Sequence, residues 1–306
     1  MVFAAGGHLI TYFQAIVIGL LQGVTELFPI SSLGHAVILP KLVGWDLNQD
    51  KPYFLAFLVA THLATAIVLF LFFLPEWVRI LRGLGRSIRE RQIAPGDADA
   101  RLAWLLVVGT IPAGLIGLLF EHSLRTLFAS PTAAAAFLLV NGLLLFAAEY
   151  LRRRAPGADE RARNLERLDE TATSPEAEKR LATVGFREAV GVGTAQAAAL
   201  FPGISRAGVT MGGGLFVGLT HEDAARYAFL LATPIIGAAA LLKLPDLLGH
   251  NGDGVRGQAL VGALCAGVAA WFAVKFLMRY FETNKLTPFA VYCLLAGLVA
   301  LLVFVL

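Results

Sequence analysis

Side chains that could take part in catalysis are concentrated at two points of an otherwise apolar chain. The first point holds Glu26 and His35, and the second holds Arg206. Ionisable groups inside a membrane segment are costly and usually functional. Amide and hydroxyl side chains surround both points: Gln22, Thr25, Ser31, Ser32, Gln196, Ser205 and Thr210. A carboxylate, an imidazole, a guanidinium and several hydroxyls together form a suitable set for binding a multiply charged phosphate.

A proline interrupts an apolar segment at each of the two points. The half-segments on either side of Pro29 and of Pro202 are Tyr12–Phe28, Ser31–Val43, Val184–Phe201 and Ile204–Leu219. Each half is too short for a comfortable span, so we expect two re-entrant helix pairs. A helix that begins just after each proline presents unpaired N–H groups and a positive dipole end, which bind anions and especially phosphate. If the two breaks meet, both helix N-termini serve one site.

Each of these residues also has a purely structural interpretation. Ser31 and Ser32 follow a proline, where serines are typical N-caps. His62 lies in an apolar segment, and we expect a hydrogen-bonded interior histidine rather than a site residue. Glu26 and Arg206 could form a structural ion pair, but their positions at matching breaks favour a functional role.

The composition is that of an integral membrane protein. Of 306 residues, 57% are apolar and 15% are charged, against about 25% charged in a typical soluble domain. Six further segments have the length and composition of membrane spans: Tyr53–Leu74, Leu102–Phe120, Thr132–Tyr150, Ala224–Leu244, Gln258–Phe281 and Leu286–Leu306. The net charge of +3 does not indicate nucleic-acid binding, because the basic residues flank apolar segments. Cys265 and Cys293 lie inside such segments, so neither a disulfide framework nor a zinc site is predicted.

The chain contains two copies of one plan. The stretches GLLQGVTELFPISSLGH (Gly19–His35) and GTAQAAALFPGISRAGVT (Gly193–Thr210) share Gln, Leu-Phe-Pro and Ile-Ser, and three of the six spans follow each stretch. An odd number of crossings in each copy predicts that the second copy is inverted, as in many transporters.

The predicted fold class is therefore an all-α integral membrane protein with two inverted-topology repeats, each a re-entrant helix pair followed by three transmembrane helices. We expect one polytopic membrane domain over residues 1–306. Repeat one covers about 8–150, a cytoplasmic linker about 151–183, and repeat two about 184–306.

Basic residues predict the orientation of the chain. They are concentrated in the loops Pro75–Arg101 and Leu151–Thr183, which two spans separate. Because cytoplasmic loops carry an excess of Lys and Arg, both loops are expected in the cytoplasm. The second loop also carries many acids, as a solvated linker does. Both termini and the first break then face outward. The N-terminal Met1–Phe13 has no charged region, so a removed signal peptide is not expected.

The residues at the two breaks resemble the signatures of a known family. QGVTE (Gln22–Glu26), running into PISSLGH (Pro29–His35), resembles the first signature of the undecaprenyl-diphosphatase (BacA/UppP) family, and PGISRAGVT (Pro202–Thr210) resembles its second. GTIPA (Gly109–Ala113) and FLLATP (Phe229–Pro234) also look like the family. The resemblance therefore covers nearly the whole chain.

The resemblance implies hydrolysis of undecaprenyl diphosphate to the monophosphate and inorganic phosphate. This reaction recycles the carrier lipid for peptidoglycan synthesis and confers bacitracin resistance. The resemblance also implies a bacterial inner-membrane location with the active site facing the periplasm. The expected partners are the polyprenyl diphosphate substrate and membrane lipid, with no nucleic acid, and a homodimer is left open.

Carried over by position, Ser32 resembles the proposed nucleophile, with Glu26 and His35 near it and Arg206 gripping phosphate. The other expected substrate ligands are Gln22, Thr25, Ser31, Ser205 and Thr210. A serine nucleophile needs a base, and either His35 or Glu26 could serve. A phosphoserine intermediate and direct attack by water are both left open.

The resemblance further implies a divalent cation, Mg²⁺ or Ca²⁺. Glu26 is the one evident acidic ligand, and Mg²⁺ often binds through one or two carboxylates together with substrate phosphates. The sequence departs from the family at Leu33, where Thr is usual, and at Ala207, where Ser is usual. Neither residue can therefore bind phosphate through its side chain.

The alternative function comes from another class of protein. Inverted repeats with broken helices at the midplane are typical of secondary transporters, so a lipid flippase or transporter is the competing interpretation.

Overall fold

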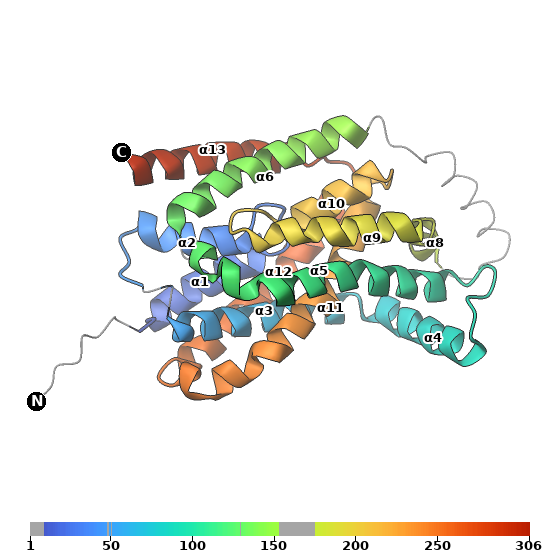
Figure 1. Ribbon diagram of the computed structural model, residues 1–306, viewed down its shortest axis with the longest axis horizontal. Coiled ribbons are helices and arrows are strands. Elements are labelled where there is room, and N and C mark those ends of the chain that lie inside the picture. The colour runs from blue at the N-terminus through green and yellow to red at the C-terminus, as the bar shows by residue number, and fades with distance from the viewer. Residues whose placement is uncertain (1–8, 48, 50, 129, 153–174) are drawn as a thin grey trace, which may run out of the picture.

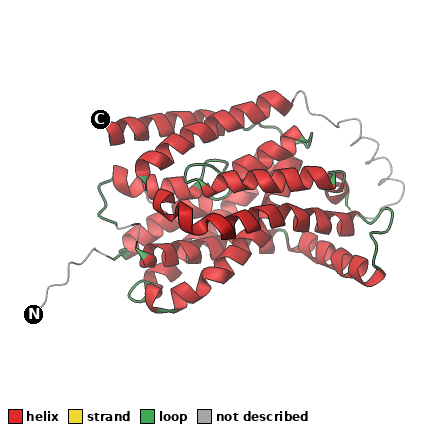
Figure 2. Ribbon diagram, in the orientation of Figure 1, coloured by secondary structure: helices red, strands yellow, loops and turns green. Residues whose placement is uncertain are grey.

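The computed structural model describes residues 9–47, 49, 51–128, 130–152 and 175–306. Within these residues all regular structure is helical, with no strand (Figure 2). The elements are α1 (Tyr12–Thr25), α2 (Ser32–Leu42), α3 (Pro52–Phe72), α4 (Leu74–Glu90), α5 (Ala98–Phe128), α6 (Pro131–Arg152), α8 (Glu176–Ala182), α9 (Phe186–Ala195), η1 (Gln196–Leu200), α10 (Arg206–Phe216), α11 (His221–Leu248), η2 (His250–Gly252), α12 (Arg256–Tyr280) and α13 (Thr287–Val305).

Six of these helices are long and apolar enough to cross a membrane. They are α3, α5, α6, α11, α12 and α13, and each coincides with one of the predicted spans to within a few residues at its ends. Much of their surface is apolar and exposed, as expected for helices that face lipid rather than water. The chain is therefore a multi-pass membrane protein.

The two broken segments form helix pairs, as predicted. Helix α1 ends at Thr25 and α2 begins at Ser32, on either side of Pro29. Helix α9 continues as the 3₁₀ helix η1 to Leu200, and α10 begins at Arg206 after Pro202. A proline has no N–H to donate and clashes with the preceding turn, so neither segment can continue as one straight helix.

The helices of the two sequence copies are interleaved. Helix α1 of the first copy packs along α12 of the second, and α9 of the second copy packs along α5 of the first. The contacts correspond: a Cβ on Gly19 would lie 2.3 Å from the carbonyl oxygen of Gly262, and one on Gly193 would lie 2.2 Å from that of Gly109. Small residues at such crossings let membrane helices approach closely.

Two further helix pairs join the copies directly. Helix α6 lies beside α13 at the top of Figure 1, and α3 packs against α11. Neither copy therefore forms a separate half of the molecule.

Two parts of the basic loops differ from the prediction. Most of the predicted loop Pro75–Arg101 forms α4, which buries Trp77 and Ile80 and packs against α5. The end of the predicted solvated linker forms α8, where Glu178 is 2% exposed and pairs with Arg79. The prediction of a solvated linker is wrong for α8, because its buried face packs on α5. Residues 153–174 of the linker lie outside the described residues.

Candidate active site

The two breaks lie against each other inside the bundle. The N–H of Gly203 donates a hydrogen bond to Ser31 Oγ over 3.1 Å, and the hydroxyl of Ser205 donates to the carbonyl oxygen of Phe28 over 3.4 Å. A Cβ on Gly34 would lie 2.9 Å from Gly203 Cα. The start of α2 therefore packs directly on the second break, and the polar residues of both breaks share one region.

Asn141 of α6 links the two breaks through its side-chain amide. Its Nδ2 donates to the carbonyl oxygen of Pro29 over 2.9 Å, and its Oδ1 accepts the N–H of Ser205 over 2.9 Å. The residue is fully buried. Breaking these hydrogen bonds would leave buried polar groups unpaired, which costs about 1–3 kcal/mol for each group. Asn141 therefore fixes the spacing between the breaks.

Side chains from four helices converge on the carboxylate of Glu26, which directly follows α1. Arg206, the first residue of α10, pairs with Oε1. Oε2 accepts hydrogen bonds from Gln22 Nε2 over 2.9 Å and from the hydroxyl of Ser32. His62 of α3 places Nε2 3.3 Å from the same oxygen. Glu26 is thus the common partner of three predicted site residues and of His62, which was expected to have a structural role.

Arg206 and His62 form the accessible side of this cluster. Their side chains are 21% and 26% exposed, whereas the side chain of Glu26 is 4% exposed. An anion that approaches the cluster would therefore contact the guanidinium and the imidazole before the carboxylate.

Both new helices begin beside Glu26 with a serine cap. Ser31 Oγ accepts the N–H of Gly34 over 3.3 Å at the start of α2, and Ser205 Oγ accepts the N–H of Gly208 over 3.1 Å at the start of α10. The remaining N–H groups of each first turn point toward the region of the break, where the positive dipole ends favour an anion. Both helix N-termini therefore lie together as the sequence predicts, and phosphate binding there stays a prediction.

His35 lies near the cluster but makes other contacts. Its Nδ1 donates to the carbonyl oxygen of Ser31 over 2.7 Å, and its Nε2 lies 2.7 Å from the hydroxyl of Tyr292 in α13. The two rings stack with 5.7 Å between centroids. Both ring nitrogens are therefore engaged away from Ser32. Of the two bases that the sequence left open, Glu26 is the one whose carboxylate accepts the hydrogen bond of the Ser32 hydroxyl.

The other predicted ligands bond mainly within their own helices. Thr25 Oγ1 donates to the carbonyl oxygen of Leu21 over 2.7 Å, and Thr210 Oγ1 donates to that of Arg206 over 2.8 Å. Gln22 differs, because its buried Oε1 has no hydrogen-bond partner in the described part of the chain. Roles in substrate binding for these residues stay predictions.

The residues around Glu26 do not fit a cation held by the protein alone. Four donors, two of them basic side chains, already surround the two carboxylate oxygens. Among the described residues, His, Cys, Asp and Glu nowhere form a group of three that could hold a metal ion. A divalent cation at this site would need phosphate oxygens of the substrate as its main ligands.

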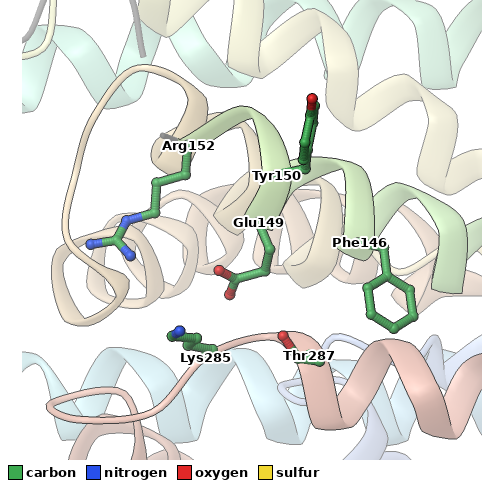
Figure 3. Close-up of a pocket in the computed structure, with 6 residues that line it drawn as sticks. All are labelled: Phe146, Glu149, Tyr150, Arg152, Lys285 and Thr287. Atoms are coloured by element: carbon green, nitrogen blue, oxygen red, sulfur yellow. The ribbon is translucent and has the colours of Figure 1, made fainter. Parts of the chain in front are cut away.

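A separate pocket of about 300 Å³ lies at the end of α6 and the start of α13 (Figure 3). Phe146, Glu149, Tyr150, Arg152, Lys285 and Thr287 line it. Glu149 accepts the N–H of Leu286 over 2.7 Å, which ties the two helices together. None of the predicted site residues lines this pocket, so it is not the candidate active site.

Three residues of the site, His62, Asn141 and Tyr292, were not predicted from the sequence as site residues. Each is a polar residue inside a span with no motif beside it. Asn141 had the clearest signal, because an amide in the middle of an apolar helix needs a partner. The expected hydrogen bond of His62 is present, since Nδ1 bonds the carbonyl oxygen of Leu58 over 2.7 Å, but its contact with Glu26 was not predicted.

The sequence matches the family described as bacitracin resistance protein BacA over residues 15–299. It is 52% identical over 296 residues to the undecaprenyl-diphosphatase of Mycolicibacterium paratuberculosis, covering 94% of this chain and 95% of the relative. It is 46% identical over 341 residues to undecaprenyl-diphosphatase 2 of Frankia alni, covering 95% and 97%. It is 42% identical over 294 residues to undecaprenyl-diphosphatase 2 of Chromobacterium violaceum, covering 94% and 97%. With a match over almost its whole length, and with Glu26, Ser32 and Arg206 gathered where its two signatures meet, the chain belongs to the bacitracin resistance protein BacA family.

Proposed function

We propose that this chain is an undecaprenyl-diphosphate phosphatase, which hydrolyses undecaprenyl diphosphate to undecaprenyl phosphate and inorganic phosphate. The reaction recycles the lipid carrier for peptidoglycan synthesis and confers bacitracin resistance. The names of the full-length relatives support this assignment, and the membrane helices suit a substrate with a long apolar tail. The comparisons do not favour the transporter alternative.

One observation carries the mechanism: the Glu26 carboxylate accepts the Ser32 hydroxyl while pairing with Arg206. Phosphoryl transfer depends mainly on positioning and on neutralising charge. The two helix N-termini and the guanidinium of Arg206 supply the positive field for a diphosphate. A guanidinium can bind two phosphate oxygens at once, so Arg206 can exchange its partner Glu26 for the substrate.

The release of Arg206 from Glu26 makes the carboxylate a better base for Ser32. In the nucleophilic route, Glu26 takes the Ser32 proton as Oγ attacks the terminal phosphorus. The bond from that phosphorus to the bridging oxygen breaks, and undecaprenyl phosphate leaves. Water then attacks the phosphoserine, the bond from phosphorus to Ser32 Oγ breaks, and the proton on Glu26 returns to Oγ as inorganic phosphate leaves. In the alternative route, Glu26 takes a proton from a water molecule that attacks the terminal phosphorus directly, and the bond to the bridging oxygen breaks as undecaprenyl phosphate leaves.

A divalent cation, Mg²⁺ or Ca²⁺, would enter this site with the substrate. The phosphate oxygens would be its main ligands, and Glu26 could join them only after giving up Arg206 or His62. When bound, the cation would neutralise charge on the diphosphate. We expect chelation to lower phosphate release and added Mg²⁺ or Ca²⁺ to restore it, while the melting temperature of the substrate-free protein stays unchanged.

The two sequence copies are inverted repeats in this proposal, with the Arg-rich loops in the cytoplasm of the cell. Corresponding contacts at Gly19 and Gly193 support the repeat relation. The first break then enters from the periplasm of a bacterial inner membrane, and the active site faces that side. A homodimer is not required, because one chain supplies all four helices around Glu26.

Phosphate release by the purified protein in detergent tests the function. Transport needs two compartments and hydrolysis does not, so release of phosphate from undecaprenyl diphosphate separates the two activities. We expect release by the wild-type protein and by Arg256→Ala, which removes an exposed arginine paired with Asp253, but not by Arg206→Ala. A wild-type protein that releases no phosphate, or an Arg206→Ala variant as active as wild type, would contradict the proposal.

A further inference from the structure

His62 reaches the candidate active site from α3, a helix that carries neither signature. Its Nε2 lies 3.3 Å from Glu26 Oε2, the same oxygen that accepts the Ser32 hydroxyl. His62 therefore contacts the same carboxylate oxygen that is proposed to take the proton of Ser32.

The other ring nitrogen fixes the orientation of the imidazole. Nδ1 lies 2.7 Å from the carbonyl oxygen of Leu58. A carbonyl oxygen can only accept, so Nδ1 carries a hydrogen. A lone pair on Nε2 would be repelled by the carboxylate, so a proton must lie between Nε2 and Oε2. His62 is therefore hydrogen-bonded to Glu26 through Nε2 and to its own helix through Nδ1.

The other contacts of Glu26 show why the contact with His62 is needed to hold Oε2 in place. Arg206 holds Oε1, and the proposed mechanism removes that contact when the substrate binds. Gln22 and His62 are then the donors, besides Ser32, that keep the carboxylate in place. Gln22 lies one turn before Glu26 in the same segment, so His62 is the contact that comes from a separate helix.

We propose that His62 is a positioning residue that holds Glu26 Oε2 against the Ser32 hydroxyl while Arg206 moves to the substrate. This role rests on the proposed function. His62 acts through Glu26, so its loss affects the chemical step more than the affinity for the lipid. A misplacement of about 1 Å in a reacting group can cost about a hundredfold in rate.

The test compares His62→Leu with His62→Gln by kcat and KM for phosphate release from undecaprenyl diphosphate in detergent. The leucine removes the donor, and the amide of glutamine can still donate to Oε2 from the same position. We expect His62→Leu to lower kcat by about tenfold or more with KM within about threefold of wild type, and His62→Gln to recover kcat to within about threefold. Thr65→Val is the matched control, because it removes a buried hydroxyl of α3 that, among the described residues, donates to the carbonyl oxygen of Thr61 and makes no contact with Glu26.

Several results would contradict this role. They are a His62→Leu variant with wild-type kcat, a rise in KM alone, or equal loss in the leucine and glutamine variants. Melting temperatures of both variants check that each protein is folded, and kcat is referred to folded protein. A wild-type protein that releases no phosphate overturns the proposed function and this role together. An active wild type with an unaffected His62→Leu variant overturns the role of His62 alone.

Discussion

At the residue scale, Glu26 is a buried carboxylate that pairs with the guanidinium of Arg206 and lies 3.3 Å from the imidazole of His62. Removing one partner of a buried ion pair costs about 3–5 kcal/mol, because the other charge is left uncompensated. The pair of Glu26 with Arg206 therefore has two consequences. Loss of either partner alone should destabilise the packing of the two breaks, and in the proposed mechanism the pair keeps Glu26 a weak base until the substrate binds the guanidinium.

Replacing Ser32 distinguishes the two chemical routes. Ser32→Ala removes the hydroxyl bonded to Glu26 and should abolish phosphate release if a phosphoserine forms. Ser31→Ala is the control. It removes an N-cap that accepts two N–H groups and should lower the melting temperature with a smaller effect on rate. Phosphate release in detergent measures the rates of the two variants, and thermal unfolding measures their melting temperatures. A Ser32→Ala rate within about tenfold of wild type, roughly 1.4 kcal/mol, would favour direct attack by water.

Replacing Arg206 separates its proposed catalytic role from its structural one. Arg206→Lys keeps the charge but loses the planar fork, so we expect a loss of about a hundredfold in kcat, and a larger loss for Arg206→Ala. The double variant Arg206→Met with Glu26→Gln removes both buried charges and should recover much of the melting temperature without recovering activity. A double variant that hydrolyses the diphosphate near the wild-type rate would show that neither residue is catalytic.

At the element scale, the second break depends on Gly203. Its φ of +106° lies in the left-handed region that favours glycine, and a Cβ there would lie 2.3 Å from the carbonyl oxygen of Ala134 in α6. The close approach lets Gly203 donate its N–H to Ser31. The break is therefore shaped by the neighbouring helix as well as by Pro202.

Substituting Gly203 should disturb the packing of the two breaks against each other rather than a single helix. Gly203→Ala is expected to cost about 2 kcal/mol or more in stability and to lower phosphate release, because backbone strain and a clash act together. Thermal unfolding in detergent is the measurement. Gly191→Ala in α9 is the control, since a Cβ there meets nothing within 4 Å. It should be neutral or slightly stabilising, given the higher helix propensity of alanine. Equal melting temperatures for the two variants would contradict this account of Gly203.

The breaks were predictable because their signals are local. Pro29 and Pro202 interrupt apolar runs with matching neighbours, and Glu26 lies just before the first proline while Arg206 lies just after the second. The position of His62 was not predictable, because α3 is apolar all round and its sequence does not reveal which side faces Glu26. The contacts of Asn141 were not predictable either, because its hydrogen-bond partners Pro29 and Ser205 lie 112 and 64 residues away in the sequence.

At the scale of the whole molecule, the exposure of the basic loops was predicted wrongly in part, because the sequence does not show which distant residues become neighbours. Many charges predict exposure, but α8 pairs them internally: Arg180 bonds Asp223 of α11, and Glu178 pairs with Arg79 of α4. The charge count of a loop does not record such pairs. The number and place of the spans followed from length and hydropathy alone.

The orientation of the molecule can be tested with single cysteines at two exposed positions. The side chains of Arg89 and His250 are 79% and 104% exposed, so a difference in labelling reflects the side of the membrane. In intact cells, an impermeant thiol reagent should label His250→Cys and leave Arg89→Cys unlabelled until the membrane is permeabilised. The unsubstituted chain, with Cys265 in α12 and Cys293 in α13, gives the background. Labelling of Arg89→Cys in intact cells would reverse the proposed topology and the periplasmic site.

The interleaving of the two copies determines when the site can exist during synthesis. Glu26 leaves the ribosome 180 residues before Arg206, which at roughly 5–20 residues per second is a delay of about ten to forty seconds. Gly262, which packs on α1, and Tyr292, which contacts His35, follow later still. Throughout this interval the carboxylate has no guanidinium and must be protonated or hydrated to remain near the membrane interior. The contacts of the first signature are therefore complete only after the last helix has been made, and the first signature to be translated is among the last parts of the protein to reach its final structure.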